Sequence, residues 1–148
     1  MANLLFSTED AVDRVLTNIT SRLCNNGLLL MTITDANVLV HRVRELGKRT
    51  SDGKWIYGNE HYSIMFDSLE FKGSPYGLKY NFFLEDSVGE RNEDTGEIIY
   101  VPEYLIEMKE FMRKTESYGF EVLENLNFTE VYHKYKENPK YFELMQKM

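Results

Sequence analysis

The chain has 148 residues, of which 43% are hydrophobic and 14% aromatic, so it can bury the core of one domain. Its longest apolar run covers residues 28–33, interrupted once by Thr32, which is far short of the ~20 residues that a membrane span needs. No apolar h-region follows the first residues, so the sequence predicts no signal peptide. A single cysteine, Cys24, excludes an internal disulfide and a multi-cysteine zinc site and favours a reduced, intracellular compartment.

The balance of 17 basic and 24 acidic side chains gives a net charge of −7. This charge argues against binding nucleic acid by phosphate neutralisation alone, which needs clustered cations, but not against recognition of one nucleotide in a pocket. Residues 42–54 are the local exception, with five cations against Glu45 and Asp52. This stretch is either a solvated helix end and loop or a patch that faces phosphates.

The first half of the chain predicts a helix, a buried strand and a second helix. Ser7 and Thr8 are hydroxyl caps for a helix whose apolar residues recur at helical spacing up to residue 23. Residues 28–33 are typical of a strand buried on both faces, as in a parallel sheet. Asp35 or Asn37 could then cap a helix that ends at Gly47. This order favours an α/β domain, in which the loop at residues 34–37 would follow a strand's carboxyl end, where ligands bind.

The second half predicts a β insertion at about residues 55–86, with alternating strands at 61–66 and 78–84. Residues 86–100 are acidic and turn-prone, which predicts an exposed loop. Pro102 is then predicted to be the first residue of a helix, with Glu103 in its first turn. Three further elements are expected, a strand at 120–126 and short helices at 131–136 and 139–146.

No residue pattern in the sequence indicates a catalytic centre. The sequence has no glycine-rich phosphate loop, no Walker lysine and no nucleophile elbow. His41, His61 and His133 are far apart in sequence, so surface histidines are more plausible than metal ligands, and Cys24 is expected to be a packing residue. We predict no catalytic side chain and no metal site.

Three segments stand in a specific order and spacing: YGNEHYSI at 57–64, PYGLKYNFFLE at 75–85 and VPEYLI at 101–106. Together they resemble the cap-binding half of eukaryotic mRNA cap guanine-N7 methyltransferases. Weaker likeness at residues 6–16, 35–38 and 118–128 extends the resemblance over most of the chain. The resemblance implies a partial Rossmann-like class I methyltransferase fold with a β-strand insertion. It also implies a nuclear, RNA-binding enzyme that transfers a methyl group from S-adenosylmethionine to the guanosine cap of nascent mRNA.

The resemblance assigns cap-binding roles to three residues. Glu103 matches the glutamate that holds the guanine, where a carboxylate would accept bonds from the ring N–H and the exocyclic amine; otherwise it only satisfies a helix dipole. Tyr80 matches a tyrosine of the β-ribbon near the cap or its phosphates; otherwise it forms a cross-strand aromatic pair with Tyr62 or Phe82. Thr34 occupies the place where the family usually has proline beside the guanine.

Other parts of the family's pattern are missing. The glycine-rich loop and the acidic residues that hold S-adenosylmethionine would lie upstream, a cap-contacting tyrosine would lie beyond Met148, and Asn3-Leu4 replaces a His-Tyr pair. We therefore expect residues 1–148 to be the carboxyl-side part of a single methyltransferase domain, inactive alone and with the cofactor site mostly outside it.

Several arrangements follow from this expectation. The chain is either a piece of the enzyme or a subunit whose partner supplies the cofactor half. A second hypothesis is a non-catalytic activator on a degenerate methyltransferase scaffold. A third is a binding module unrelated to methylation. Expected partners are the capped 5′ end of mRNA, the missing amino-terminal half, and other capping and transcription proteins, with no membrane. Two strands without their usual neighbours would expose apolar surface, which predicts rearranged packing or self-association.

Overall fold

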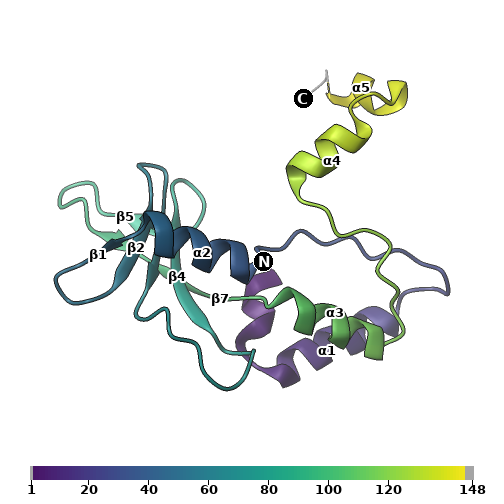
Figure 1. Cartoon of the computed structure of the whole chain (residues 1–148), viewed down its shortest axis with the longest axis horizontal. Coiled ribbons are helices and arrows are strands. Elements are labelled where there is room, and N and C mark those ends of the chain that lie inside the picture. Colours follow the sequence, from purple (N-terminus) through teal and green to yellow (C-terminus); the bar gives the residue numbers. More distant parts are fainter. Residues whose placement is uncertain (1, 146–148) are drawn as a thin grey trace.

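The computed structural model describes residues 2–145 and contains a sheet, a helix across it, a pair of helices beside it and a terminal helical segment (Figure 1). The helical elements are the 3₁₀ helix η1 (Ala2–Ser7), α1 (Glu9–Thr20), α2 (Ala36–Leu46), α3 (Met108–Ser117), α4 (Phe128–Tyr135) and α5 (Pro139–Met145). The strands are β1 (Lys48–Arg49), β2 (Trp55–Gly58), β3 (Tyr62–Phe66), β4 (Lys79–Leu84), β5 (Glu90–Arg91), β6 (Ile98–Ile99) and β7 (Val101–Tyr104).

The main sheet has the order β1-β2-β3-β4-β7, and every pair of neighbouring strands in it is antiparallel. Sequence reasoning expected a parallel sheet, and for the described residues that expectation is wrong. The chain is a mixed α/β structure, and the one parallel contact is an isolated bridge between Asp35 and Ile106. No helix lies between β1 and β7, and strands without a helical crossover between them pair antiparallel, because a parallel pair requires a long crossover.

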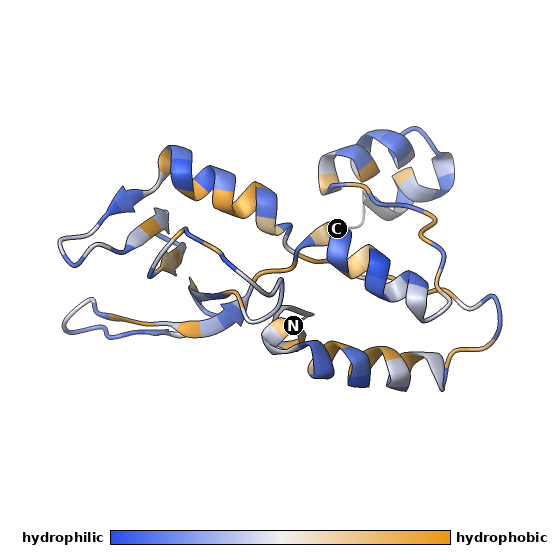
Figure 2. Cartoon of the chain, turned by 60° about the horizontal axis from the view of Figure 1, so that its bottom comes forward, coloured by the Kyte–Doolittle hydropathy of each residue, from blue (hydrophilic) through white to orange (hydrophobic). Residues whose placement is uncertain are grey.

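Helix α2 lies across one face of this sheet and closes the larger core. Leu39, Val40 and Val43 of α2 are buried against Phe66 of β3 and Tyr80 of β4. Figure 2 shows the hydrophobic side of α2 turned toward the strands and its hydrophilic side turned outward. Because side chains alternate along a strand, this contact defines an α2-facing surface of the sheet.

A second core joins α1 to α3 and η1. Its most buried members are Phe6, Val12, Leu16 and Ile106.

Polar contacts join the same two helices. The Lys114 ammonium on α3 donates to Glu9 at 2.7 Å and lies 2.8 Å from an Asp13 carboxylate oxygen, both on α1. Tyr118 donates from its hydroxyl to Asp13 at 2.7 Å. Hydrogen bonds from Lys114 and then Tyr118 hold the pKa of Asp13 below its usual value. Helix α1 is therefore held against α3, which lies far from it in the sequence.

The predicted helix caps are confirmed. Thr8 Oγ1 accepts a hydrogen bond from the Ala11 N–H at 3.2 Å, and Asp35 Oδ1 accepts one from the Asn37 N–H at 2.7 Å. Helix α2 ends before Gly47, as predicted, and α4 and α5 occupy the two short helical stretches expected near the carboxyl end.

Two predicted strands are absent from the described residues. The segments at 28–33 and 120–126 are extended but pair with no strand within residues 2–145. Leu30 is 92% exposed and Leu123 is 69% exposed. The predictions of a buried strand at 28–33 and of a strand at 120–126 are therefore wrong. An apolar run becomes a strand only when a neighbouring strand supplies backbone partners.

The helix predicted to begin at Pro102 is also wrong. Pro102 lies in β7 opposite Asn81, and the helix begins later, at Met108, with Glu107 as its N-cap. β7 is an edge strand, and an edge tolerates proline because one of its sides needs no backbone donor. The predicted insertion at 55–86 contains β2, β3 and β4, but the sheet extends beyond it to β1 and β7.

The acidic segment at 86–100 is largely exposed, as predicted, and also contains the short β5–β6 hairpin. None of the helices in residues 2–145 combines the length and apolar character that crossing a membrane requires.

Candidate functional site

Tyr80 and Glu103 lie directly opposite each other on β4 and β7. Directly opposed residues of an antiparallel pair project from the same face, here the α2-facing surface. The Tyr80 hydroxyl donates a hydrogen bond to Glu103 Oε2. The structure therefore brings together two of the three cap-binding residues predicted from the sequence.

The ring of Tyr80 belongs to the core. The residue is 3% exposed, and its ring stacks on Phe66 with centroids 5.5 Å apart and planes inclined by 25°. Sequence reasoning named Tyr62 and Phe82 as aromatic partners; both pack in the same cluster, but the stacked partner is Phe66. Because this packing locks the ring, the hydroxyl is presented to Glu103 from a fixed direction.

Glu103 is half-buried on the edge strand rather than in the first turn of a helix. The alternative interpretation, that Glu103 only satisfies a helix dipole, is therefore wrong. The carboxylate is oriented instead by the Tyr80 hydroxyl, which donates a hydrogen bond to Oε2. The β-prone residues Ile98, Ile99, Val101 and Tyr104 were the signal that could have identified a strand here.

Thr34, the third predicted residue, lies just before the start of α2. It is exposed and directly precedes Asp35, whose bridge to Ile106 joins the start of α2 to the chain just after β7. The Ala36 N–H donates to the Ile106 carbonyl at 3.1 Å, which fastens the same junction. Thr34 is thus close in the fold to the carboxyl end of β7, and a direct role beside a ligand stays a prediction.

The far end of the α2-facing surface is basic and aromatic. Arg42 of α2 lies beside Tyr57 of β2, whose ring meets Tyr62 of β3 edge-on at 6.1 Å. A hydrogen bond with Tyr62, and then one with Arg42, lowers the pKa of the Tyr57 hydroxyl. These contacts tie the last turns of α2 to the sheet.

No group of three or more histidine, cysteine or acidic side chains in residues 2–145 is arranged to hold a metal ion. His41 and His61 are exposed and each lies near glutamate, His41 at 3.3 Å from Glu45 and His61 at 3.5 Å from Glu60. A surface hollow of about 350 Å³ lies on α1, away from the Tyr80–Glu103 pair, and is lined by Val15, Asn18, Ile19, Arg22 and Leu23.

Comparison with known proteins decides the family. The mRNA (guanine-N(7))-methyltransferase domain matches residues 2–148, which is nearly the whole chain. The chain belongs to this family. Its identified members include mRNA cap guanine-N(7) methyltransferase 1 of rice, to which it is 32% identical over 146 residues, covering 97% of this chain and 36% of the rice protein.

Fungal members show the same partial coverage. The mRNA cap guanine-N(7) methyltransferase of Candida glabrata is 30% identical and that of Schizosaccharomyces pombe 28%, and the aligned parts make up 31% and 36% of those proteins. The chain therefore spans about a third of the length of the relatives it matches. The family resemblance inferred from residues 57–64, 75–85 and 101–106 is confirmed.

Members of a methyltransferase family generally use S-adenosylmethionine. Nucleotide-type cofactors are held by a glycine-rich turn between a strand and a helix. The nine glycines of this chain are all at least four positions apart, so the G-x-G-x-x-G motif is not present in it.

Proposed function

We propose that this chain contributes the cap-guanine site of an mRNA cap guanine-N7 methyltransferase, and that the Tyr80–Glu103 pair is the centre of that site. The observation that carries the proposal is the position of this pair: each residue belongs to a segment that resembles the family's cap-binding half, and the hydrogen bond joins them. Neither segment alone would form the site, since the two lie on different strands.

The chemistry of guanine suits this pair. The Watson–Crick edge of guanine presents a ring N–H and an exocyclic amine side by side, and a carboxylate can accept both. A carboxylate has about four acceptor positions, so a bond from Tyr80 is compatible with two from the base. Methylation at N7 makes the ring cationic, and a nearby carboxylate stabilises that developing charge. Tyr80 acts through Glu103 as a positioning residue.

Transfer itself would depend on placing the two substrates rather than on a side-chain base. Holding the guanine with its N7 atom directed at the methyl donor converts an encounter into a positioned reaction. S-adenosylmethionine would supply the methyl group, from a site formed mostly by residues outside this chain. In this proposal Glu103 orients the base, and Thr34, near the carboxyl end of β7, takes the place beside the guanine where the family usually has proline.

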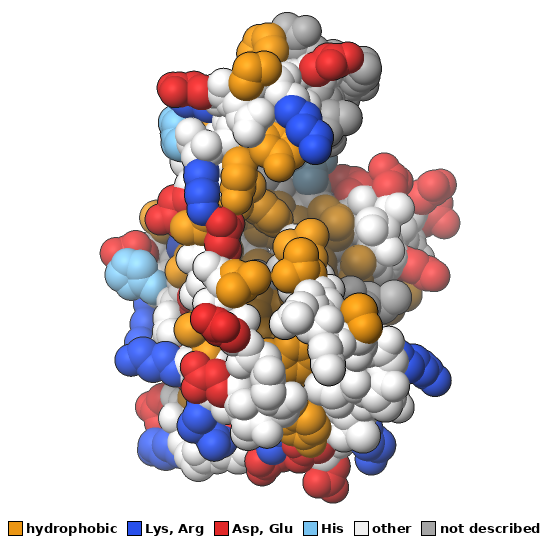
Figure 3. Space-filling view, turned by 90° about the vertical axis from the view of Figure 1, so that its right-hand side faces the viewer, with side chains coloured by type: hydrophobic (Ala, Val, Ile, Leu, Met, Phe, Trp, Pro, Cys, Tyr) orange, Lys and Arg blue, Asp and Glu red, His pale blue; other side chains and the backbone are white. Residues whose placement is uncertain are grey.

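The exposed apolar segments support the proposal that this chain is the carboxyl-side part of one methyltransferase domain. Leu28, Leu30 and Leu123 are exposed, although their segments have the composition of buried strands. Figure 3 shows hydrophobic side chains gathered in the middle of the face between α4–α5 and the helices below them. We propose that the remaining part of the domain covers this face, and that the enzyme acts in the nucleus with other capping proteins.

A cap-binding assay tests the site. Titration of the 148-residue chain with the dinucleotide cap analogue GpppG should show saturable binding, and Glu103→Ala should weaken it by at least about tenfold, as expected for loss of a charged hydrogen-bond acceptor. Glu93→Ala, which removes an exposed carboxylate in the acidic loop, is the matched control and should bind as the wild type does. Equal affinity of all three proteins would remove the cap site from this chain.

A transfer assay tests the cofactor assignment. Methyl transfer to a guanosine-capped RNA is expected only when the cofactor-binding half of the enzyme is supplied. Tight binding of S-adenosylmethionine by this chain alone would contradict the assignment. Absence of transfer in the complemented protein would favour a non-catalytic activator instead.

A further inference from the structure

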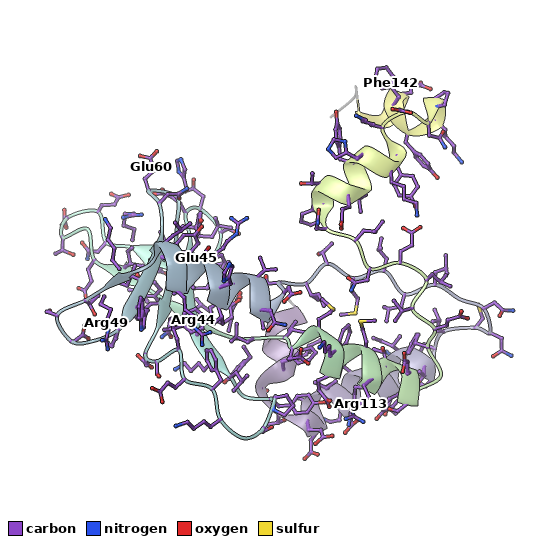
Figure 4. The ribbon with its side chains drawn as sticks, viewed as in Figure 1. Arg44, Glu45, Arg49, Glu60, Arg113 and Phe142 are labelled. Carbon is purple, nitrogen blue, oxygen red and sulfur yellow. The ribbon has the colours of Figure 1, made fainter. Side chains whose placement is uncertain are left out.

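One edge of the sheet differs in charge from the rest of the molecule. Residues 42–54 contain five cations and two carboxylates, a net charge of +3, so the remaining 135 residues carry −10. These cations lie on the last turns of α2, in β1 and in the turn that leads to β2. In Figure 4, Arg44 and Arg49 lie at the sheet end of the molecule, far from Phe142 of α5.

Arg49 and the chain's single tryptophan form the centre of this edge. Arg49 lies directly opposite Trp55, and its guanidinium carbon is 5.5 Å from the centre of the indole ring. An Arg49 N–H also donates to the Gly53 carbonyl at 3.3 Å, which holds the side chain over the turn. Trp55 is half-buried and packs against the α2 core, which supports the ring from one side.

The nearby carboxylates are occupied by other groups. Asp52 lies 3.0 Å from Lys54, and Glu45 lies 3.3 Å from His41. Asp67 also acts on Lys54, at the start of β2. No carboxylate of residues 2–145 is within ion-pair distance of Lys48 or Arg49, both of which are exposed. The positive charge of β1 is therefore available to an external anion.

This edge and the proposed cap site share one surface of the sheet. Arg49 lies on the α2-facing side because it opposes Trp55, as Glu103 does because it opposes Tyr80. The four steps from β7 to β1 span roughly 19 Å at about 4.8 Å per strand. Helix α2 begins beside the end of β7 and ends two residues before β1, so its 11 residues cover about 16 Å of the same route.

We propose that the β1–β2 edge binds the phosphates of the single-stranded RNA that follows the cap, with Lys48 and Arg49 contacting phosphates and Trp55 stacking against a base. The inference rests on the proposed cap site, which fixes where the RNA begins. Cations interleaved with an aromatic ring are the usual platform for single-stranded nucleic acid. An acidic peptide would use the charge but would gain nothing from the indole.

Because Trp55 is the only tryptophan, its fluorescence reports on this edge alone. An uncapped ten-nucleotide RNA should quench it in a saturable way. The double variant Lys48→Gln/Arg49→Gln should bind about tenfold more weakly at 100 mM salt. Its log–log salt slope should be lower by about 1.4, or ~0.7 for each lost phosphate contact. The matched control, Lys72→Gln/Lys109→Gln, loses the same charge from exposed positions elsewhere and should bind as the wild type does.

Several outcomes would overturn the inference. One is an equal salt slope for the double variant and its control. Another is quenching by an oligoglutamate peptide but not by RNA, which would assign the edge to a protein partner. A third is unchanged RNA binding with new self-association of the double variant. That result would mean that Lys48 and Arg49 prevent β1 from pairing with the edge strand of another molecule.

The two proposals fail separately. Glu103→Ala should weaken GpppG binding by at least about tenfold and leave binding of uncapped RNA intact. Lys48→Gln/Arg49→Gln should weaken RNA binding about tenfold and leave GpppG binding intact. Loss of both activities in either variant, with an unchanged circular dichroism spectrum, would contradict the division of the surface into two sites.

Discussion

The hydroxyl of Tyr80 donates a hydrogen bond to Glu103 Oε2 across the ladder that joins β4 to β7. The ring beneath that hydroxyl is locked by Phe66, so the core of the sheet determines where the carboxylate lies. The candidate site is thereby built on strands rather than loops, which favours accurate positioning.

Removal of this hydroxyl tests the link. Tyr80→Phe retains the ring and should lower the free energy of unfolding by only about 0.5–1.5 kcal/mol, as expected for one hydrogen bond. Affinity for GpppG should fall about fivefold because Glu103 loses its orienting partner. Urea denaturation and titration calorimetry measure the two effects. Tyr62→Phe, in the same cluster but on β3, is the control, and an equal loss of GpppG affinity there would contradict the positioning role.

Thr34→Pro tests whether residue 34 contributes to binding of the guanine. The residue is exposed and lies outside any helix or strand, directly before the N-cap Asp35, where proline is tolerated. Proline should leave the thermal midpoint unchanged and tighten GpppG binding about threefold, equivalent to burial of roughly one methylene. Unchanged affinity would remove residue 34 from the site.

The raised pKa of Tyr76 predicts that the folded protein loses stability at alkaline pH. Burial, and then its hydrogen bond to Glu110 at 2.8 Å, raise the pKa of Tyr76 to about 12. A pKa raised by folding contributes stability that is complete below the unfolded value, near 10, and is lost as the pH rises toward 12. The urea midpoint should therefore fall between about pH 10 and 12, and should fall less in Tyr76→Phe. Tyr132→Phe, at an exposed tyrosine, should behave as the wild type; an equally steep fall in Tyr76→Phe would contradict the assignment.

The exposed apolar segments predict that the chain self-associates, and that their side chains contribute little to its folding stability. Leu30→Gln/Leu123→Gln changes residues that are 92% and 69% exposed, so the thermal midpoint should stay constant while the sedimenting mass decreases. Leu16→Ala is the contrast, since Leu16 is 2% exposed and its truncation should cost about 2–5 kcal/mol. A wild-type chain that sediments as a monomer at high concentration would show the self-association prediction to be wrong.

Local signals predicted much of this fold. Thr8, Asp35 and Gly47 bound their helices because caps act through backbone groups only a few residues away. The alternation at residues 61–66 and 78–84 identified β3 and β4 for the same reason, since one buried face imposes a period of two.

Prediction failed where the deciding partner is distant in sequence. The apolar run at 28–33 has strand composition but no strand beside it within residues 2–145, so composition could not determine its state. Pro102 satisfies a helix start and an edge strand equally well, and pairing with β4 decides between them. Of the site, the sequence named Tyr80, Glu103 and Thr34, but the hydrogen bond between the first two depends on a register that no local pattern reveals.

The contacts of Lys114 with Glu9 and Asp13 join positions 105 and 101 residues apart, whereas β2, β3 and β4 follow one another along the chain. Closure of so large a loop carries an entropic cost that neighbouring hairpins avoid. We expect α1 to dock after the sheet has formed, so that Lys114→Met accelerates unfolding in stopped-flow measurements and leaves the folding rate unchanged. Helix α1, although it precedes the sheet in the sequence, would then be among the last elements to reach its place.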